Sequence, residues 1–187
     1  MKTILTVAIT GLLFYSCANS AHKSGADALQ PKQNVIEMNN DMEKASLLIP
    51  SWINENTVIA MKEPGAHSGR YACITNDTIE YSYGYMEQIK NIVPGLPKYI
   101  LVSGWAYTTV AHPKLAIILD ISEKNTQNDW MAFPLADSLI ATGKWIEFNA
   151  SFYFSKPLNP EQQLKIYAWN QSKKPIYIDD LALRFEY

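Results

Sequence analysis

The feature of this sequence that most restricts its fold is a set of short runs in which apolar and polar residues alternate. In 164–170 (LKIYAWN), aliphatic side chains alternate with Lys165, Tyr167 and Trp169, and 145–154 alternates in the same way. The β-rich segment 99–107 divides by parity into two sets, one of which contains Trp105 and Tyr107. Successive side chains of a β-strand point to opposite faces, so this period of two predicts strands with one buried face. The segment LAIILDIS is apolar almost throughout, which is typical of a strand covered on both faces.

Turn-forming residues separate these runs at fairly regular spacing. The connections contain PGLPK, AHPK, SEKNTQND, ATGK, KPLNPEQQ and NQSKKP, which are rich in the Gly, Pro, Asn and Asp that tight turns favour. No long stretch has a helical period. Short strands joined by such turns predict an all-β sandwich. A chain of 187 residues with 48% hydrophobic content is sufficient for one domain with a core.

The N-terminus has the organisation of a secretory signal. Lys2 precedes an apolar run at 4–15, and a serine and Cys17 follow it. The run is too short to span a bilayer comfortably, as expected for a signal peptide. A small residue directly before a cysteine resembles the processing site of bacterial lipoproteins. The site resembles the looser form found in Bacteroidetes, because Phe14 and Tyr15 depart from the common Leu-Ala or Leu-Ser pattern.

This resemblance implies that residues 1–17 are a signal peptide with Cys17 as the lipidation site. Residues 18–33, which are small and polar, are then a flexible tether, and 34–187 are the folded domain. The lipid anchor implies a membrane partner and a place in the cell envelope. Ala18 is not acidic, which by analogy with known sorting signals favours the outer membrane, on its periplasmic or surface-facing side. The alternative is plain secretion, with Cys17 removed or unmodified.

The cysteine content agrees with this interpretation. The chain has 2 Cys, so if Cys17 carries a lipid, Cys73 stands alone and forms no disulfide. A disulfide between Cys17 and Cys73 is the alternative. Cys73 lies in the apolar run RYACI, which predicts a buried, inert thiol rather than a nucleophile.

Five segments, taken in their order along the chain, carry a family resemblance. They are NDMEK, AHSGRYAC, YILVSGWAY, GKWIEFNASF, and LKIYAWN followed by PIYIDDLAL. Together they resemble the galactose-binding-like jelly rolls that include many bacterial carbohydrate-binding modules, over nearly all of 34–187. The resemblance implies a jelly-roll β-sandwich and a glycan partner, although jelly rolls also serve as spacers, adhesion domains and assembly parts.

The resemblance also implies a structural calcium ion. In many of these modules an acidic residue near the first strand and one near the last share a calcium with carbonyls of a turn, and Glu43, the turn at His67, and Asp179 or Asp180 fall on those positions. Calcium takes several oxygen ligands and would neutralise charge that is costly to bury. The alternative is that alternation places Asp179 and Asp180 on opposite faces, where one caps a loop, and that His67 only makes a hydrogen bond in its turn.

Aromatic residues are the candidate ligand-binding groups, because sugars stack their C–H faces on aromatic rings while their hydroxyls pair with polar side chains. Tyr167 and Trp169 share one strand face and are the leading pair. Trp105 and Tyr107 have the same spacing on another strand, and Trp130 is expected in a polar loop, KNTQNDWMAF. For each of them the alternative is packing: Trp105 in the core, and Tyr167 and Trp169 beneath a loop or the N-terminal segment.

Motifs for catalysis are absent from the sequence. It contains no glycine-rich phosphate loop, no His-Glu-x-x-His and no Gly-x-Ser-x-Gly, and a net charge of −2 gives no basic field for nucleic acid. The sequence therefore predicts a non-catalytic glycan-binding protein of the envelope. A structural or protein-interaction module that contacts an envelope protein is one alternative. A small glycoside hydrolase, with two carboxylates facing each other across a cleft, is the other.

Overall fold

The structure is a computed structural model that describes residues 35–92, 97–124, 126–154 and 156–187. They belong to one compact unit, Gln33–Tyr187. The predicted signal peptide 1–17, Cys17 and the tether 18–33 lie outside the described residues, and so does the first residue of the predicted domain. No helix within the described ranges is long and apolar enough to cross a membrane.

Strands dominate the described residues. In chain order they are β1 (Val35–Asn40), β2 (Trp52–Ile53), β3 (Val58–Ala60), β4 (Tyr71–Thr75), β5 (Gly84–Gln88), β6 (Tyr99–Thr108), β7 (Leu115–Glu123), β8 (Thr126–Pro134), β9 (Trp145–Tyr153), β10 (Gln163–Asn170) and β11 (Ile176–Glu186). Three short 3-10 helices accompany them: η1 (Ser46–Leu48), η2 (Glu55–Thr57) and η3 (Ile89–Asn91).

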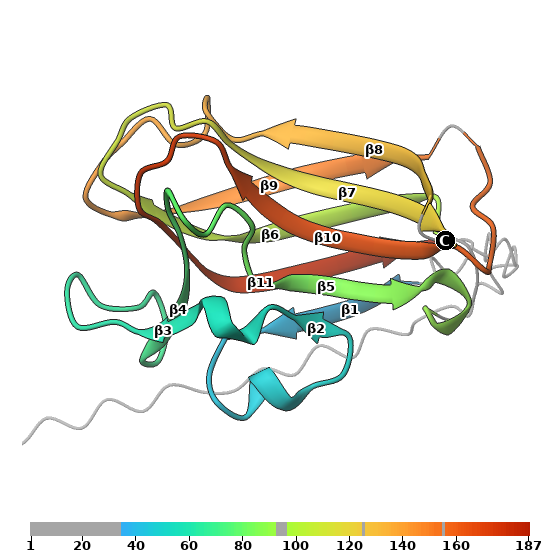
Figure 1. The fold of residues 1–187 in the computed structure, drawn as a ribbon, viewed down its shortest axis with the longest axis horizontal. Coiled ribbons are helices and arrows are strands. Elements are labelled where there is room, and N and C mark those ends of the chain that lie inside the picture. The colour runs from blue at the N-terminus through green and yellow to red at the C-terminus, as the bar shows by residue number, and fades with distance from the viewer. Residues whose placement is uncertain (1–34, 93–96, 125, 155) are drawn as a thin grey trace, which may run out of the picture. The chain divides into compact units, whose positions relative to one another are not determined.

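The strands form two antiparallel sheets in jelly-roll order (Figure 1). The first sheet has the order β3-β4-β11-β6-β9, with β1 also paired to β11, and the second has the order β2-β5-β10-β7-β8. Four of the pairs, β4–β11, β5–β10, β6–β9 and β7–β8, are the arms of one long hairpin whose tip is the β7–β8 turn. Rolling this hairpin adds the pairs β6–β11 and β7–β10. The prediction of an all-β jelly-roll sandwich is confirmed.

The alternating runs bury one face each, as predicted. In β10 the side chains of Leu164, Ile166 and Ala168 are at most 3% exposed, and the residues between them are only partly buried. In β7, by contrast, three successive residues from 117 to 119 are buried. Ile118 among them pairs with Tyr167 on β10, so it lies on the outer face of the second sheet. An apolar layer therefore covers that face as well.

Cys73 is a fully buried free thiol, as predicted. Its Sγ accepts a hydrogen bond from the Tyr83 N–H at 3.2 Å and lies 3.3 Å from Thr57 Oγ1. Burial raises the pKa of the thiol to about 11, so the nucleophilic thiolate is scarce at neutral pH.

A bulge interrupts β11 at its two aspartates. The pairing of β11 with β6 shifts register between Asp179 and Ala182, and Asp180 has a φ of 49°. On the other edge of β11, β4 pairs with 176–178 and β1 with 181–186. The extra residue lies where the partner strand changes, and bulges at such points redirect side chains.

Candidate functional site

Four aromatic side chains gather on the outer face of the second sheet, and we call them the aromatic platform. Tyr167 and Trp169 lie on β10, Trp130 lies on β8, and Tyr81 forms an isolated bridge with Trp169. Tyr81 is 49% exposed and Trp130 is 40% exposed. Clusters of exposed aromatic side chains, unlike single exposed rings, mark interaction sites.

The rings of the platform support one another. Trp130 meets Trp169 edge to face, with centroids 6.0 Å apart and planes at 78°, and Tyr81 meets Tyr167 in the same manner at 5.6 Å and 83°. Tyr81 and Trp169 are nearly parallel, at 22°, with centroids 6.3 Å apart. Because the rings are already held, a ligand that stacks on them needs to order few side chains.

Gly84 on β5 lies directly against β10 beside Tyr167, where there is no space for a side chain. A Cβ added at Gly84 would lie 2.3 Å from the Ile166 carbonyl oxygen and 3.0 Å from the Tyr167 Cβ. Any side chain at this position would displace the backbone of β10, so a glycine is required for the close approach of β5 to β10.

Two hollows border the platform. The first, the polar hollow, has a volume of about 280 Å³ and is lined by Ile53, Asn54, Tyr81, Met86, Asp120, Lys165 and Tyr167. The second, the apolar hollow, has a volume of about 260 Å³ and is lined by Pro113, Lys114, Leu115, Ala116, Trp130, Ala132, Pro134, Ala136, Trp169 and Gln171. Tyr167 borders the first and Trp169 the second, so both hollows adjoin the leading pair of predicted ligand-binding residues.

Two buried polar atoms at the platform lack a hydrogen-bond partner among the described residues: Asp120 Oδ1 and Trp169 Nε1. Asp120 pairs with Lys165 on β10 and with Trp130 on β8, which places its carboxylate among the rings. Burial raises the pKa of the Tyr167 hydroxyl. A hydrogen bond with Trp130 lowers this pKa in part, and the nearby charge of Asp120 raises it further. An unsatisfied buried polar atom costs about 1–3 kcal/mol. Such atoms often mark places where a ligand or water completes the structure.

The predicted ligand-binding residues fall into two groups on opposite sheets. The structure brings Trp130 to Tyr167 and Trp169 at the platform. Trp105 and Tyr107 lie on β6 of the first sheet and do not join them. The His67 ring stacks on Trp105 at 3.9 Å and 13°, so part of the indole face is already covered.

The prediction of a polar loop around Trp130 is wrong. Trp130 lies within β8 and pairs with Asp120 on β7. The run of polar residues before it resembled a loop because β8 is the edge strand of its sheet, where neither face needs to be fully apolar. Sequence reasoning also missed Asp120, although a single carboxylate inside the apolar run LAIILDIS was a signal for it.

Tyr81 is the other platform residue that the sequence did not distinguish. It belongs to the alternating run EYSYGYM, in which Tyr83 and Tyr85 are the buried members, at 0% and 3% exposure. Trp52 packs against both of them, with ring centroids 5.7 Å from Tyr83 and 5.6 Å from Tyr85. Spacing alone gave no means of separating the exposed tyrosine from the two core tyrosines.

The predicted metal ligands converge on one loop, residues 65–71, and we call Glu43, His67, Asp179 and Asp180 the acidic cluster. Asp179 Oδ2 accepts hydrogen bonds from the backbone N–H groups of His67 and Ser68 at 2.9 and 3.2 Å. Asp180 lies 2.6 Å from His67 Nδ1 and accepts a 2.7 Å bond from Ser68 Oγ. Both aspartates thus contact the same loop, because the bulge removes the simple alternation of faces.

Glu43 binds the same loop from the other end of the sequence. Its Oε1 accepts hydrogen bonds from the backbone N–H groups of Arg70 and Tyr71, at 2.6 and 3.0 Å. The described residues contain no group of three or more His, Cys, Asp or Glu side chains placed to hold a metal ion. The carboxylates have backbone N–H groups, the Ser68 hydroxyl and the His67 ring as partners, and this arrangement holds the loop without a cation. Calcium therefore stays a prediction.

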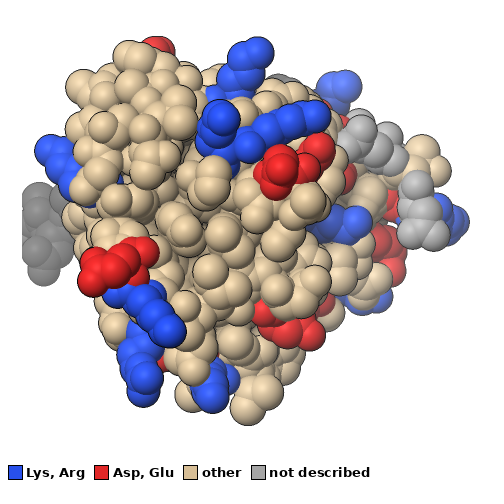
Figure 2. Space-filling model, turned by 60° about the vertical axis from the view of Figure 1, so that its left-hand side comes forward, with Lys and Arg blue, Asp and Glu red and all other residues tan. Residues whose placement is uncertain are grey.

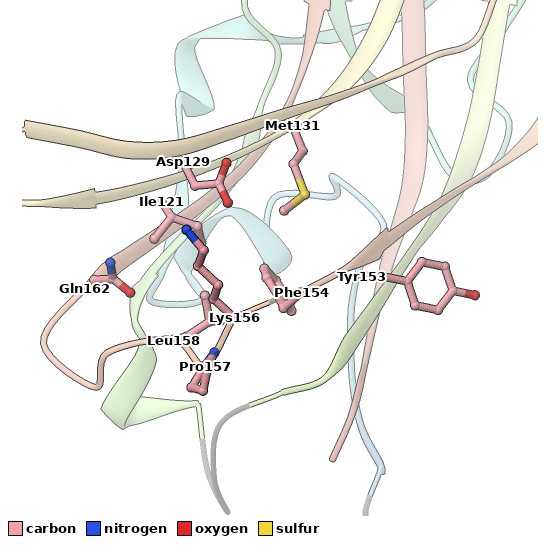
Figure 3. Close-up of a pocket in the computed structure, with 9 residues that line it drawn as sticks. All are labelled: Ile121, Asp129, Met131, Tyr153, Phe154, Lys156, Pro157, Leu158 and Gln162. Atoms are coloured by element: carbon pink, nitrogen blue, oxygen red, sulfur yellow. The ribbon is translucent and has the colours of Figure 1, made fainter.

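A larger hollow, of about 510 Å³, lies at one end of the sandwich near the β9–β10 connection (Figure 3). Asp129 and Lys156 reach over it from opposite sides, and within the described part of the chain they form no ion pair. Tyr153 is 70% exposed but points away from the hollow in Figure 3, and Phe154 packs against the core. Tyr153 is thus the one strongly exposed ring among the residues that line this hollow, which therefore lacks a group of rings like that of the platform.

Charge is mixed on the surface. On the face shown in Figure 2, Lys and Arg side chains are interspersed with Asp and Glu, and wide uncharged areas separate them. This face has no continuous basic surface of the kind that binds nucleic-acid phosphates.

Comparisons with known proteins give distant structural neighbours. No family model and no curated protein matches the chain. The CBM22-2 xylan-binding domain of Paenibacillus barcinonensis Xyn10C is 16% identical, with 78% of this chain and 97% of that chain covered and a TM-score of 0.45. The CBM22-1 domain of the same enzyme is 14% identical, with coverages of 79% and 92% and a TM-score of 0.44. TmCBM61, solved with β-1,4-galactotriose, is 15% identical, with coverages of 82% and 88% and a TM-score of 0.36. These values are too low to transfer a ligand or a residue role to this chain.

Proposed function

We propose that the domain is a non-catalytic glycan-binding module of the cell envelope and that the aromatic platform is its binding surface. The observation that carries the proposal is the combination of exposed, mutually supported rings with the unpaired Asp120 Oδ1 and Trp169 Nε1. A glycan offers apolar C–H faces for the rings and hydroxyl groups for the polar atoms.

Each part of the platform has a role in this proposal. Tyr81 and Trp169, which are nearly parallel, present faces on which sugar rings stack. In the polar hollow, Asp120 accepts a hydrogen bond from a hydroxyl, while Lys165 and Asn54 donate to hydroxyl oxygens. Because Asp120 Oδ1 and Trp169 Nε1 are covered in the free protein, a small movement of the neighbouring rings accompanies binding.

The number of carboxylates in the site favours glycan binding over glycoside hydrolysis as the function. Among the described residues that line the two hollows, Asp120 is the only carboxylate. Glycoside hydrolysis generally requires two carboxylates about 5–10 Å apart across the scissile bond. The remaining alternative is that the platform binds an envelope protein, since exposed aromatic residues also anchor protein interfaces.

A glycan screen with matched variants tests the proposal. The purified chain is applied to a panel that includes xylan and β-1,4-galactan, which the similar structures suggest as probes, and hits are measured by titration. In the double variant Tyr167→Ala/Trp169→Ala we expect a loss of at least about 30-fold, because the loss of even one anchor worth about 2 kcal/mol lowers the affinity by that factor. The control Tyr153→Ala removes a 70% exposed ring away from the platform and should leave the affinity unchanged. A folded wild-type protein that binds no glycan would favour the protein-interaction alternative.

A further inference from the structure

We infer that the apolar hollow accommodates an acetyl substituent on the glycan, an inference that rests on the proposed function. The two hollows adjoin the same rings but differ in chemistry. The polar hollow presents Asn54, Asp120 and Lys165, whereas the residues that line the apolar hollow are the polar Lys114 and Gln171, two tryptophans and otherwise apolar residues. A glycan that spans the platform therefore meets a hollow suited to hydroxyl groups at one position and a hollow suited to an apolar group at the next.

The lining of the apolar hollow disfavours an unsubstituted sugar. Its walls are small and apolar: Pro113, Leu115, Ala116, Ala132, Pro134 and Ala136, with the indoles of Trp130 and Trp169. A hydroxyl group moved from water into such a space loses its hydrogen bonds and gains few in return. A methyl group gains from the same move, because its burial removes apolar surface from water.

The shape of the apolar hollow depends on small residues between large ones. Ala116 pairs with Trp169 on one side and with Pro134 on the other, and Ala132 pairs with the buried Ile118. The indoles of Trp130 and Trp169 stand at 78° to each other. The short alanine side chains thus leave space beside the two large rings, and the hollow of about 260 Å³ exceeds what an acetyl group needs.

Hydrogen-bond donors at this hollow select an acetyl group over a plain methyl substituent. An acetyl group carries a carbonyl oxygen beside its methyl. Trp169 lines the hollow and carries a buried Nε1 donor without a partner among the described residues, which a small shift of the ring would uncover, and the lining residues Lys114 and Gln171 supply further donors. These two lining residues are tied together by the 2.8 Å bond from the Gln171 N–H to the Lys114 carbonyl. A methyl ether or a deoxy carbon would place apolar surface in the hollow but leave the donors unused.

Two matched pairs of glycans test the inference and distinguish an ester from an amide source of the acetyl group. The first pair is O-acetylated glucomannan oligosaccharides before and after mild alkaline deacetylation. The second is tetra-N-acetylchitotetraose and cellotetraose, which share a β-1,4 backbone. Affinities for the full purified chain are measured by titration calorimetry. We expect the acetylated member of one pair to bind about tenfold more tightly than its partner.

Three results would contradict the inference, and they separate it from the proposed function. Equal affinity within every pair that binds, or binding only to glycans without acetyl groups, overturns the acetyl inference while glycan binding stands. Failure of every glycan in the panel and in both pairs overturns both. These outcomes are read on a protein whose thermal unfolding shows that it is folded.

Variants of the hollow give an independent measurement. Ala132→Leu fills the space and should abolish the preference for the acetylated member while binding of the deacetylated member is retained. Trp169→Phe keeps a ring but removes the Nε1 donor, and it should lower the preference by several fold. The control Lys165→Ala acts in the polar hollow and should weaken both members equally. An unchanged preference in both hollow variants would overturn the inference.

Discussion

Asp179 is the residue whose surroundings differ most from those of an ordinary surface carboxylate. Its side chain is fully buried, and it accepts backbone hydrogen bonds from His67, Ser68 and Asp180. Burial, together with the adjacent charge of Asp180, raises the pKa of Asp179 from 3.8 to about 6, although those hydrogen bonds favour the ionised form. The charge is therefore retained at neutral pH at a cost in stability.

This pKa predicts a stability that falls between about pH 4 and pH 6. A carboxyl whose pKa is higher in the folded state stabilises the fold below its unfolded pKa, and that contribution is lost as the pH rises through about 6. The loss amounts to about 3 kcal/mol. Urea unfolding of the wild type and of Asp179→Asn across this range measures it, and the fall should be absent from the variant. The same pH dependence in both proteins would show that Asp179 is not its source.

Gly69 is the second residue of the loop with a specific requirement. Its φ is +56°, and an added Cβ would lie 2.3 Å from Glu43 Oε1. That oxygen is held by the Arg70 and Tyr71 N–H groups, so it cannot move without losing both bonds. Position 69 thus requires a glycine for two reasons: its backbone has a positive φ, and a side chain there would clash with the Glu43 carboxylate.

We predict that Gly69→Ala is more destabilising than Gly143→Ala. Gly143 also has a positive φ, +74°, but an added Cβ there meets nothing within 4 Å. Gly143→Ala should cost about 1 kcal/mol from backbone strain alone, and Gly69→Ala about 2 kcal/mol more from lost hydrogen bonds to a charged acceptor. Chemical denaturation measures both. In a Glu43→Ala background the difference should disappear, and its persistence would contradict the assigned contact.

At the scale of elements, β11 and the 65–71 loop form a unit that joins the first and last parts of the domain. The acidic cluster holds the loop to the bulge of β11 and to Glu43, which follows β1. Loss of this unit would release β1 and β4 from the same edge of β11, since both pair there. The predicted calcium ion would act on this unit.

The calcium ion that the family resemblance implies stays a prediction, and its binding at the acidic cluster would stabilise the fold. The predicted rise in the free energy of unfolding is about 2.7 kcal/mol at a calcium concentration 100 times the Kd. Thermal unfolding in calcium, in magnesium and in EDTA measures it, and Glu43→Gln should reduce the response. Identical melting temperatures in calcium and EDTA would show that the N–H donors alone hold the loop.

At the scale of the whole molecule, the sequence predicted the strands better than the site. Alternation in LKIYAWN placed Tyr167 and Trp169 on an outer face correctly, because a strand with one apolar face has only one way to bury it. It could not show that β8 and β10 share a sheet with β7 while β6 lies in the other. The sequence therefore did not predict that Trp130 lies beside Tyr167 and Trp169 while Trp105 lies on the other sheet. Which strands pair over long sequence distances depends on the packing of the whole chain.

The proposed attachment to the envelope also belongs to the scale of the whole molecule. Cys17 lies outside the described residues, and the prediction that it carries a lipid rests on the sequence. We expect Cys17→Ser to move the protein from the membrane fraction to the soluble fraction of its native host, because the anchor is then lost. Fractionation and a palmitate label measure this. Membrane association and labelling that survive the substitution would contradict the lipidation site.

The position of β11 has a consequence for how the domain comes to be folded. β11 follows every other strand in the sequence, yet it lies between β4 and β6 in its sheet. A chain that emerges from its N-terminus therefore presents β4 and β6 long before the strand that joins them exists. Those edges stay unpaired in the meantime, and exposed edges of this kind favour aggregation. The nascent chain should depend on a holding chaperone until β11 has emerged.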